Sequence, residues 1–312
     1  MTEPRAAQGA LPHHGPSAGD YALLMLLGLV FGSTYMFISV GLQTIPPMTL
    51  AASRALVGLT VLASLALILG HETPRDARSW RAFAFIGFFG GALPFTLMSL
   101  AQQHIESSLA SIIITSMPLF TLALAHLFTD DRASRRKLAG VLIGFAGILL
   151  LLGPAALAGQ GGSLLGQALY LGVALSFATM GVLIRRLGAG TGTVLMRTAC
   201  SQAVATAILV PIAFLVEQPL AISPSAHSVL GALALGLLSS TLGQFIVFRL
   251  NATAGPNFVS ANNYMGPPVG ILWGVVLLGE EITGLRIAAM LVIFAGIAFA
   301  TKRTGVVRQE LR

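Results

Sequence analysis

The chain has 312 residues, of which 55% are hydrophobic and 9% are charged, whereas soluble domains carry about 25% charged residues. This composition excludes an ordinary soluble enzyme, because too few polar residues are present to cover a soluble fold of this length. A net charge of +7 would by itself suggest nucleic acid as a partner, but the positions of the charges favour a different explanation.

The first 20 residues are polar and interrupted by prolines, so we expect them to form a disordered tail. The apolar run that begins at Tyr21 is too long for the core of a secretory signal, and no small-residue cleavage motif follows it closely. It predicts a first membrane-spanning helix. The single cysteine, Cys200, lies inside another apolar run and excludes an intramolecular disulfide or a multi-cysteine metal cage.

A helix needs about 20 mostly apolar residues to cross the roughly 30 Å hydrocarbon core of a bilayer. Ten runs meet this condition, at 21–40, 47–69, 82–101, 109–128, 138–153, 164–184, 194–215, 228–248, 258–278 and 285–301. Long uninterrupted apolar runs favour helices, because strands of a membrane barrel alternate in polarity. The sequence therefore predicts an all-α membrane protein with ten transmembrane helices.

Basic residues occur in alternate connections between these runs. All of the 18 Lys and Arg residues except Arg54, Arg197 and Arg286 fall in one alternating set of segments, which includes both tails. The opposite set, near 41–46, 102–108, 154–163, 216–227 and 279–284, holds none. Because basic loops stay in the cytoplasm, both termini are predicted to be cytoplasmic, and the net charge reflects topology and not a nucleic-acid partner.

The two halves of the chain resemble each other when it is divided near residue 160. The best match aligns Ser116-Met117-Pro118-Leu119 and Asp130-Asp131 with Gly266-Pro267-Pro268-Val269 and Glu280-Glu281. Five helices per half is an odd number, so the second half enters the membrane inverted, an arrangement typical of secondary transporters. The predicted organisation is a tail at 1–20, repeats at 21–158 and 159–303, and a second tail at 304–312.

Four motifs resemble a known family. They are Phe31-Gly32-Ser33-Thr34-Tyr35, the stretch from Ile45-Pro46-Pro47 to Arg54, Met117-Pro118-Leu119, and Leu277-Leu278-Gly279-Glu280-Glu281. Over about residues 21–303 the chain resembles the EamA-type transporters of the drug/metabolite transporter superfamily. Phe31 stands where the family commonly has Trp, and Thr129-Asp130-Asp131 replaces a Gly-Glu pair. The resemblance implies a carrier with a central cavity lined by helices 1–4 and 6–9, and it leaves the substrate open.

Motifs for catalysis are absent from the sequence. It has no H-E-x-x-H helix, no G-x-S-x-G elbow, no phosphate-binding loop and no carboxylate pair inside a predicted span. We therefore expect no enzymatic activity, no cofactor and no metal site. All 11 acidic residues fall in tails, loops or helix ends.

The candidate substrate-binding residues are the polar and aromatic groups inside the predicted spans. They are Tyr35, Arg54, Thr96, Arg197, Gln244, Asn262, Asn263, Tyr264 and Trp273, and the candidate hinges are Pro118, Pro267 and Pro268. The two arginines either contact substrate, or extend to the headgroups or form structural pairs within the protein. The amides of the helix at 258–278 either face a cavity, where the proline pair would free nearby carbonyls, or bond to neighbouring helices.

These patterns predict a secondary-active carrier in the inner membrane that exports small polar metabolites, such as amino acids, by alternating access. Its expected partners are the substrate and the lipid bilayer, with no nucleic acid, and assembly as a homodimer is left open. A non-transporting membrane scaffold or accessory subunit is the alternative.

Overall fold

The computed structural model describes residues 16–128, 134–157, 161–187 and 190–301, and within these ranges every regular element is a helix. The α-helices are α1 (Ala18–Gly32), α2 (Thr34–Gly41), α3 (Pro47–Ile68), α4 (Ala77–Gly87), α5 (Leu93–Ala101), α6 (Ser107–Ile113), α7 (Met117–Phe128), α8 (Arg135–Leu157), α9 (Gly161–Leu187), α10 (Val194–Val216), α11 (Ala226–Ala234), α12 (Gly243–Thr253), α13 (Pro256–Val259), α14 (Asn262–Leu278) and α15 (Gly284–Thr301). The π-helical segments are η1 (Phe88–Ala92) and η4 (Leu235–Leu242), and the 3₁₀ turns are η2 (Ile114–Ser116) and η3 (Pro219–Ala221).

Eight helical segments are long and apolar enough to cross a membrane. They cover Ala18–Gly41, Pro47–Ile68, Ala77–Ala101, Ser107–Phe128, Arg135–Gly153, Ser163–Ile184, Val194–Val216 and Ala226–Val247, and they coincide with the first eight predicted spans. The ninth and tenth predicted spans correspond to α14 and α15, which are helical but shorter. The all-helical membrane fold is confirmed, whereas the count of ten crossings and the inverted repeat stay predictions.

Several helix starts differ from the predicted positions, and at two of them polar capping residues before the apolar run explain the difference. Helix α1 begins at Ala18, within the predicted tail, because Ser17 and Asp20 form a reciprocal capping box. Helix α4 begins at Ala77 and not at residue 82, since the Asp76 carboxylate accepts a hydrogen bond from the Ser79 amide at 2.8 Å. The rest of the predicted tails, together with Asp130-Asp131, lies outside the described residues.

The third and eighth spans each contain a π-helical segment, η1 and η4, at corresponding places in the two predicted halves. Small residues permit close packing at η1, where a side-chain carbon on Gly91 would lie 2.7 Å from Ala205 Cβ. In η4 the Thr241 hydroxyl donates to the Gly236 carbonyl, five residues earlier, at 3.0 Å. Such segments are rare and occur frequently at functional sites.

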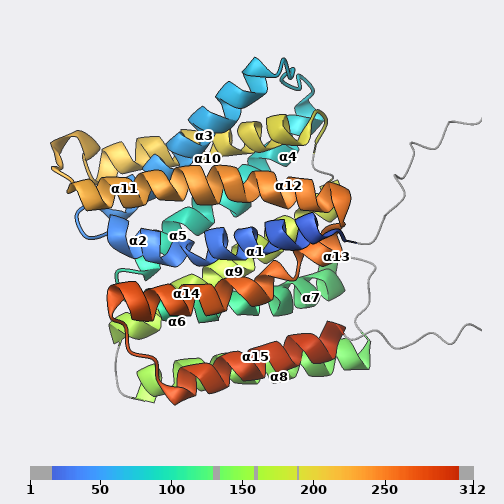
Figure 1. Cartoon of the computed structure of the whole chain (residues 1–312), viewed down its shortest axis with the longest axis vertical. Coiled ribbons are helices and arrows are strands. Elements are labelled where there is room, and N and C mark those ends of the chain that lie inside the picture. Colours follow the sequence, from blue (N-terminus) through green and yellow to red (C-terminus); the bar gives the residue numbers. More distant parts are fainter. Residues whose placement is uncertain (1–15, 129–133, 158–160, 188–189, 302–312) are drawn as a thin grey trace, which may run out of the picture.

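The helices run side by side in one bundle (Figure 1). Segments from the two halves of the sequence pack together: α3 lies against α10 at one edge, α1 against α14 in the middle, and α8 against α15 at the opposite edge. Glycines allow these close approaches, as at Gly140 and Gly144 of α8, which face the backbone or side chains of neighbouring helices. Helix α1 begins and α15 ends at the same end of the bundle (Figure 1).

Candidate functional site

Arg54 lies buried in α3, with 8% of its surface exposed. Its Nε donates to Ser240 Oγ of η4 at 3.1 Å, and its guanidinium carbon lies 4.0 Å from the ring centroid of Phe95 in α5. Met98 of α5 provides a sulfur 3.9 Å from Nη1. Arg54 therefore contacts elements from both halves of the chain. Its hydrogen-bond partner Ser240 lies in the π-helical segment η4.

No carboxylate pairs with Arg54 among the residues that the structure describes. Placing an arginine at the centre of a membrane helix costs about 2.5–3.5 kcal/mol on insertion scales. One hydroxyl and one aromatic face offset part of that cost. A buried cation with neutral neighbours favours an anionic group, which would add a charge-assisted hydrogen bond.

Two tyrosines from different helices belong to the same buried cluster as Met98. The rings of Tyr35 (α2) and Tyr170 (α9) have centroids 6.3 Å apart, and the Tyr170 hydroxyl accepts a hydrogen bond from Gln102 Nε2 at 3.5 Å. Ser39 donates to the other end of the Gln102 amide at 3.2 Å. Sequence reasoning missed Tyr170 and Gln102, although a tyrosine in the middle of an apolar run was an available signal for Tyr170.

A row of polar contacts connects α14 to this arginine. Trp273 Nε1 donates to Ser33 Oγ at 2.8 Å, and the adjacent Thr34 shares a hydrogen bond of 2.7 Å with Ser239. Ser239 precedes Ser240, which accepts the bond from the guanidinium. Three of the nine predicted binding residues, namely Tyr35, Arg54 and Trp273, are thus brought into one connected region formed by α1, α2, α3, α14 and η4.

The three consecutive polar residues at the start of α14 have different surroundings. Asn262 Oδ1 is buried and has no hydrogen-bond partner within the described part of the chain, and it faces α1 near Gly28. The Asn263 side chain is partly buried. Tyr264 is 37% exposed, with its ring 5.3 Å from that of Phe294.

Within the described ranges, the hydrogen bonds of Arg54 do not include the remaining predicted binding residues. Arg197 donates from Nη1 to the Gly190 carbonyl at 3.4 Å, near the start of α10. Thr96 on α5 and Gln244 on α12 are partly buried.

The candidate hinge prolines do not interrupt their helices. Pro118 is the second residue of α7, directly after the 3₁₀ turn η2, where a missing amide hydrogen is tolerated. Pro267 and Pro268 lie within α14, which continues from Asn262 to Leu278. Ser111 of α6 approaches the Pro267 carbonyl at 3.4 Å, so a hydroxyl from a neighbouring helix lies near the proline pair.

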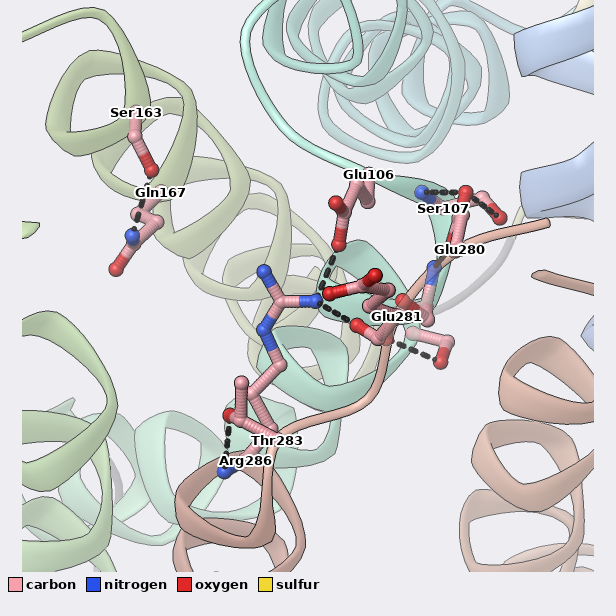
Figure 2. Close-up of polar contacts among 10 residues, drawn as sticks. Glu106, Ser107, Ser163, Gln167, Glu280, Glu281, Thr283 and Arg286 are labelled. Atoms are coloured by element: carbon pink, nitrogen blue, oxygen red, sulfur yellow. Dashed lines mark hydrogen bonds and ion pairs between the residues drawn. The ribbon is translucent and has the colours of Figure 1, made fainter. Parts of the chain in front are cut away.

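Glu280 connects the end of α14 to the start of α6 (Figure 2). Gly279 ends α14 with φ +66, and the Glu280 amide then bonds the Gly274 carbonyl at 3.0 Å, as in a glycine C-cap. The Glu280 carboxylate accepts the Ser107 amide, the Ser107 hydroxyl and the Ser108 amide, each at 2.8 Å. A side chain on Gly274 would collide with this carboxylate.

Glu217 makes the same type of contact at the start of α3. Its carboxylate accepts the Met48 amide at 2.9 Å, the Thr49 amide at 2.7 Å and the Thr49 hydroxyl at 2.8 Å. Carboxylates are favoured at helix N-termini by the free amides and the helix dipole. We call Glu217 and Glu280 the carboxylate clamps, since each joins the second half of the chain to the first turn of a helix in the first half.

An ion pair lies beside one of the clamps. Arg286 of α15 contacts the Glu106 carboxylate, and it also donates to the Glu281 carbonyl at 2.9 Å (Figure 2). Glu106, Glu281 and both clamps lie in connections that the charge pattern predicts to be outside the cell, and Arg286 lies in the first turn of α15 beside them. The sequence placed these acids in loops and helix ends, with Glu280 and Glu281 in a family motif, but their contacts were missed because the partners lie more than 160 residues away in the chain.

No group of three or more His, Cys, Asp and Glu side chains arranged to hold a metal ion occurs in the described ranges. The polar region around Arg54 contains a guanidinium, hydroxyls, an amide and aromatic rings. Such a set can bind and orient a polar molecule.

Comparison with known proteins agrees with this architecture. The EamA-like transporter family model matches residues 20–153 and again residues 164–302. The chain is 27% identical over 286 residues to the uncharacterized inner membrane transporter YedA of Escherichia coli K12, with 90% of each chain covered. It is 27% identical to a protein described as a "probable amino-acid metabolite efflux pump" of Salmonella typhimurium, covering 92% of this chain and 98% of that one.

A third relative, described as a "probable terminal-alkyne amino-acid exporter" of Streptantibioticus cattleyicolor, is 28% identical and covers 90% of this chain and 93% of its own length. A solved crystal structure superposes with a TM-score of 0.61 at 21% identity, over 91% of this chain and 97% of the other, which supports the fold. Two family matches that together span most of the sequence, with eight membrane-length helices, identify a multi-pass membrane transporter: the chain belongs to the EamA-like transporter family.

Proposed function

We propose that this protein is a secondary-active carrier that exports small carboxylated metabolites, such as amino acids, by alternating access. The observation that carries the proposal is the buried Arg54, which is bonded to a neutral hydroxyl and an aromatic face and has no carboxylate partner among the described residues. A substrate carboxylate would supply the missing negative charge.

The proposed substrate class follows from the charges around this arginine. Tyr35, Tyr170, Gln102 and Ser240 contribute hydroxyls and an amide, and the aromatic rings nearby are those of the two tyrosines and of Phe95. Apolar walls with a few placed polar groups suit ligands of small-molecule size. An organic cation without a carboxylate would meet the guanidinium and no counter-charge, so it should be a poor substrate. The names of two relatives, which refer to amino acids, support the same class.

Alternating access is proposed from an inverted repeat of five helices. Two family matches in one chain, π-helical segments at corresponding places in both halves and an odd number of predicted helices per half support this organisation. It predicts that both termini are cytoplasmic. A phosphatase fusion after residue 160 should then be active outside the cytoplasm and one after residue 132 inactive, whereas the reverse pair would contradict the orientation.

In this mechanism the carboxylate clamps close the outer end of the bundle. Glu217 and Glu280 each hold a helix N-terminus of the first half against the second half. Release of substrate to the outside requires these contacts, or the neighbouring contact of Arg286 with Glu106, to separate. The connected polar row from Trp273 to Ser240 crosses between the halves and would rearrange in the same step.

Purified protein in liposomes tests the proposed substrate class. Liposomes preloaded with an unlabelled amino acid should accumulate the labelled amino acid by counterflow, and quaternary amines should not exchange. Counterflow of quaternary amines but not of amino acids would contradict the proposal that the site binds a carboxylate. No counterflow of any small polar solute, together with folded protein, would favour a scaffold.

We propose that the start of α14 belongs to the same substrate-binding region as Arg54. Replacing Asn263 by Leu should abolish transport and leave folded protein in the membrane, because an interhelical hydrogen bond contributes only about 0.6 kcal/mol on average. A cysteine at position 263 should react with water-soluble thiol reagents to a degree that changes with conformation. Loss of folded protein in step with activity would instead assign Asn263 a structural role.

A further inference from the structure

A basic pocket lies where the start of α4 meets the end of α9. Its volume is about 190 Å³, and Arg78, Arg81, Ala82, Phe85 and Arg186 line it. The same ends of these helices belong to the segments that the charge pattern predicts to be cytoplasmic. The pocket is therefore at the opposite end of the bundle from the carboxylate clamps, and it does not include Arg54.

The three arginines come from segments that are far apart in the sequence. Arg78 and Arg81 lie in the first two turns of α4, whereas Arg186 lies in the last turn of α9, and the two helices pack against each other. Orientation in the membrane requires only that basic residues occur in cytoplasmic loops. The rule for membrane orientation does not require three arginines to line the same pocket.

The electrostatic environment of the pocket favours an anion. None of its lining residues is acidic, so no carboxylate of the lining offsets the repulsion among the three positive charges. The positive end of the α4 dipole adds to this field. Asp76, which precedes α4, is already bonded to the Ser79 amide and the Thr191 hydroxyl, at 2.8 and 2.9 Å.

The rest of the lining is apolar and continues onto an exposed apolar surface. Ala82 and Phe85 form that part of the wall, and Phe85 and Phe88 are 43% and 40% exposed on the same helical segment. In a membrane protein such rings face lipid chains. A ligand that places an anionic group among the arginines and apolar chains over these rings would satisfy both parts of the surface.

We propose that this pocket binds the headgroup of an anionic phospholipid, with its acyl chains along Phe85 and Phe88. Basic pockets between membrane helices on the cytoplasmic side bind anionic headgroups through the same chemistry. The site depends on insertion in a bilayer but not on the substrate proposed for Arg54, so the two proposals can fail separately.

The test uses the full chain purified in mixed micelles that contain equal amounts of phosphatidylglycerol and phosphatidylcholine, with bound lipid counted by native mass spectrometry. The wild type should retain more phosphatidylglycerol than phosphatidylcholine. In the variant Arg78→Gln/Arg81→Gln/Arg186→Gln the ratio of bound phosphatidylglycerol to bound phosphatidylcholine should fall by at least about tenfold. Each basic residue near a membrane surface contributes about fivefold to the affinity for an anionic lipid.

A matched control removes three exposed arginines from the same predicted side, as Arg75→Gln/Arg135→Gln/Arg249→Gln, and should keep the preference within about twofold. The single variants Arg186→Gln and Arg249→Gln repeat the comparison with one charge removed, should a triple variant fail to fold. Equal loss in the pocket and control variants would overturn the proposal. Displacement of the lipid by inorganic phosphate at about 10 mM would also overturn it, because the pocket would then be a site for free anions.

Discussion

Replacing Glu280 by Gln should open the outer end of the bundle more often. In the wild type the carboxylate accepts three hydrogen bonds of 2.8 Å from Ser107 and Ser108, at the first turn of α6. The amide keeps one acceptor oxygen, but its NH₂ group then faces a backbone N–H that needs an acceptor. The negative charge beside the helix dipole is also lost.

The size of this effect can be estimated from those contacts. Loss of the favourable charge at a helix N-terminus contributes about 0.3–1 kcal/mol, and a donor without an acceptor costs about 1–3 kcal/mol when it is buried. Because Glu280 is only partly buried, we expect a total of about 1–3 kcal/mol. If the contact exists only in the outward-closed state, the ratio of open to closed molecules rises by roughly 5- to 150-fold.

Thiol labelling measures this ratio. In a Cys200→Ala background, Ser111→Cys places a reporter on α6 at a position that is fully buried against α14. An impermeant maleimide added outside should label it faster in Glu280→Gln than in the parent. The matched control is Glu281→Gln, since Glu281 contributes its backbone carbonyl to the neighbouring contact. Equal labelling rates in parent, Glu280→Gln and Glu281→Gln would refute the role of this clamp as a gate.

Two further predictions concern packing and pH. Gly270→Ala should lower the melting temperature, because its new side-chain carbon would lie 2.5 Å from Ser111 Cβ, and overpacking costs about 1–3 kcal/mol; Gly266→Ala, with no neighbour within 4 Å, should not lower it, and the opposite order would contradict the packing. The pKa of Asp76 is held below its usual value of 3.8 by hydrogen bonds from Ser79 and Thr191, so its stabilising contribution is complete above that value and is lost as the pH falls through the lowered pKa. The melting temperature of the wild type should therefore exceed that of Asp76→Asn near pH 6 and converge with it in strong acid, whereas a difference that is independent of pH would exclude the carboxylate as the cause.

Hydropathy predicted most of the membrane helices because long apolar runs in a bilayer have few alternatives to the helix. The agreement is within one residue at each end for α3 and α10, predicted at 47–69 and 194–215 and observed at Pro47–Ile68 and Val194–Val216. It is weaker at α4, whose first turns are polar but helical because Asp76 caps them. Hydropathy has no term for capping, so it places such a helix start too late.

The polar contacts between helices were harder to predict than the helices. The intramembrane position of Arg54 marked it as a candidate, but its contacts with Ser240 and Phe95 depend on how α3, α5 and η4 pack together. Glu280 was identified as part of the motif at 277–281, but its contacts with Ser107 and Ser108 could not be predicted, because they depend on how α14 and α6 pack side by side. A single sequence shows which residue types are present, but it does not show how one helix is aligned along its neighbour.

Counterflow in liposomes tests most directly whether Arg54 binds the carboxylate of the substrate. Wild type, Arg54→Gln and Arg197→Gln should be compared with a labelled amino acid and with the corresponding amino-acid amide, which lacks the carboxylate. A charge-assisted hydrogen bond contributes about 1.5–3 kcal/mol, so Arg54→Gln should reduce amino-acid exchange by roughly 10- to 150-fold and affect the amide much less. Arg197→Gln, whose arginine bonds to Gly190, should stay near the wild-type rate. Amino-acid exchange at the wild-type rate in folded Arg54→Gln would contradict the account.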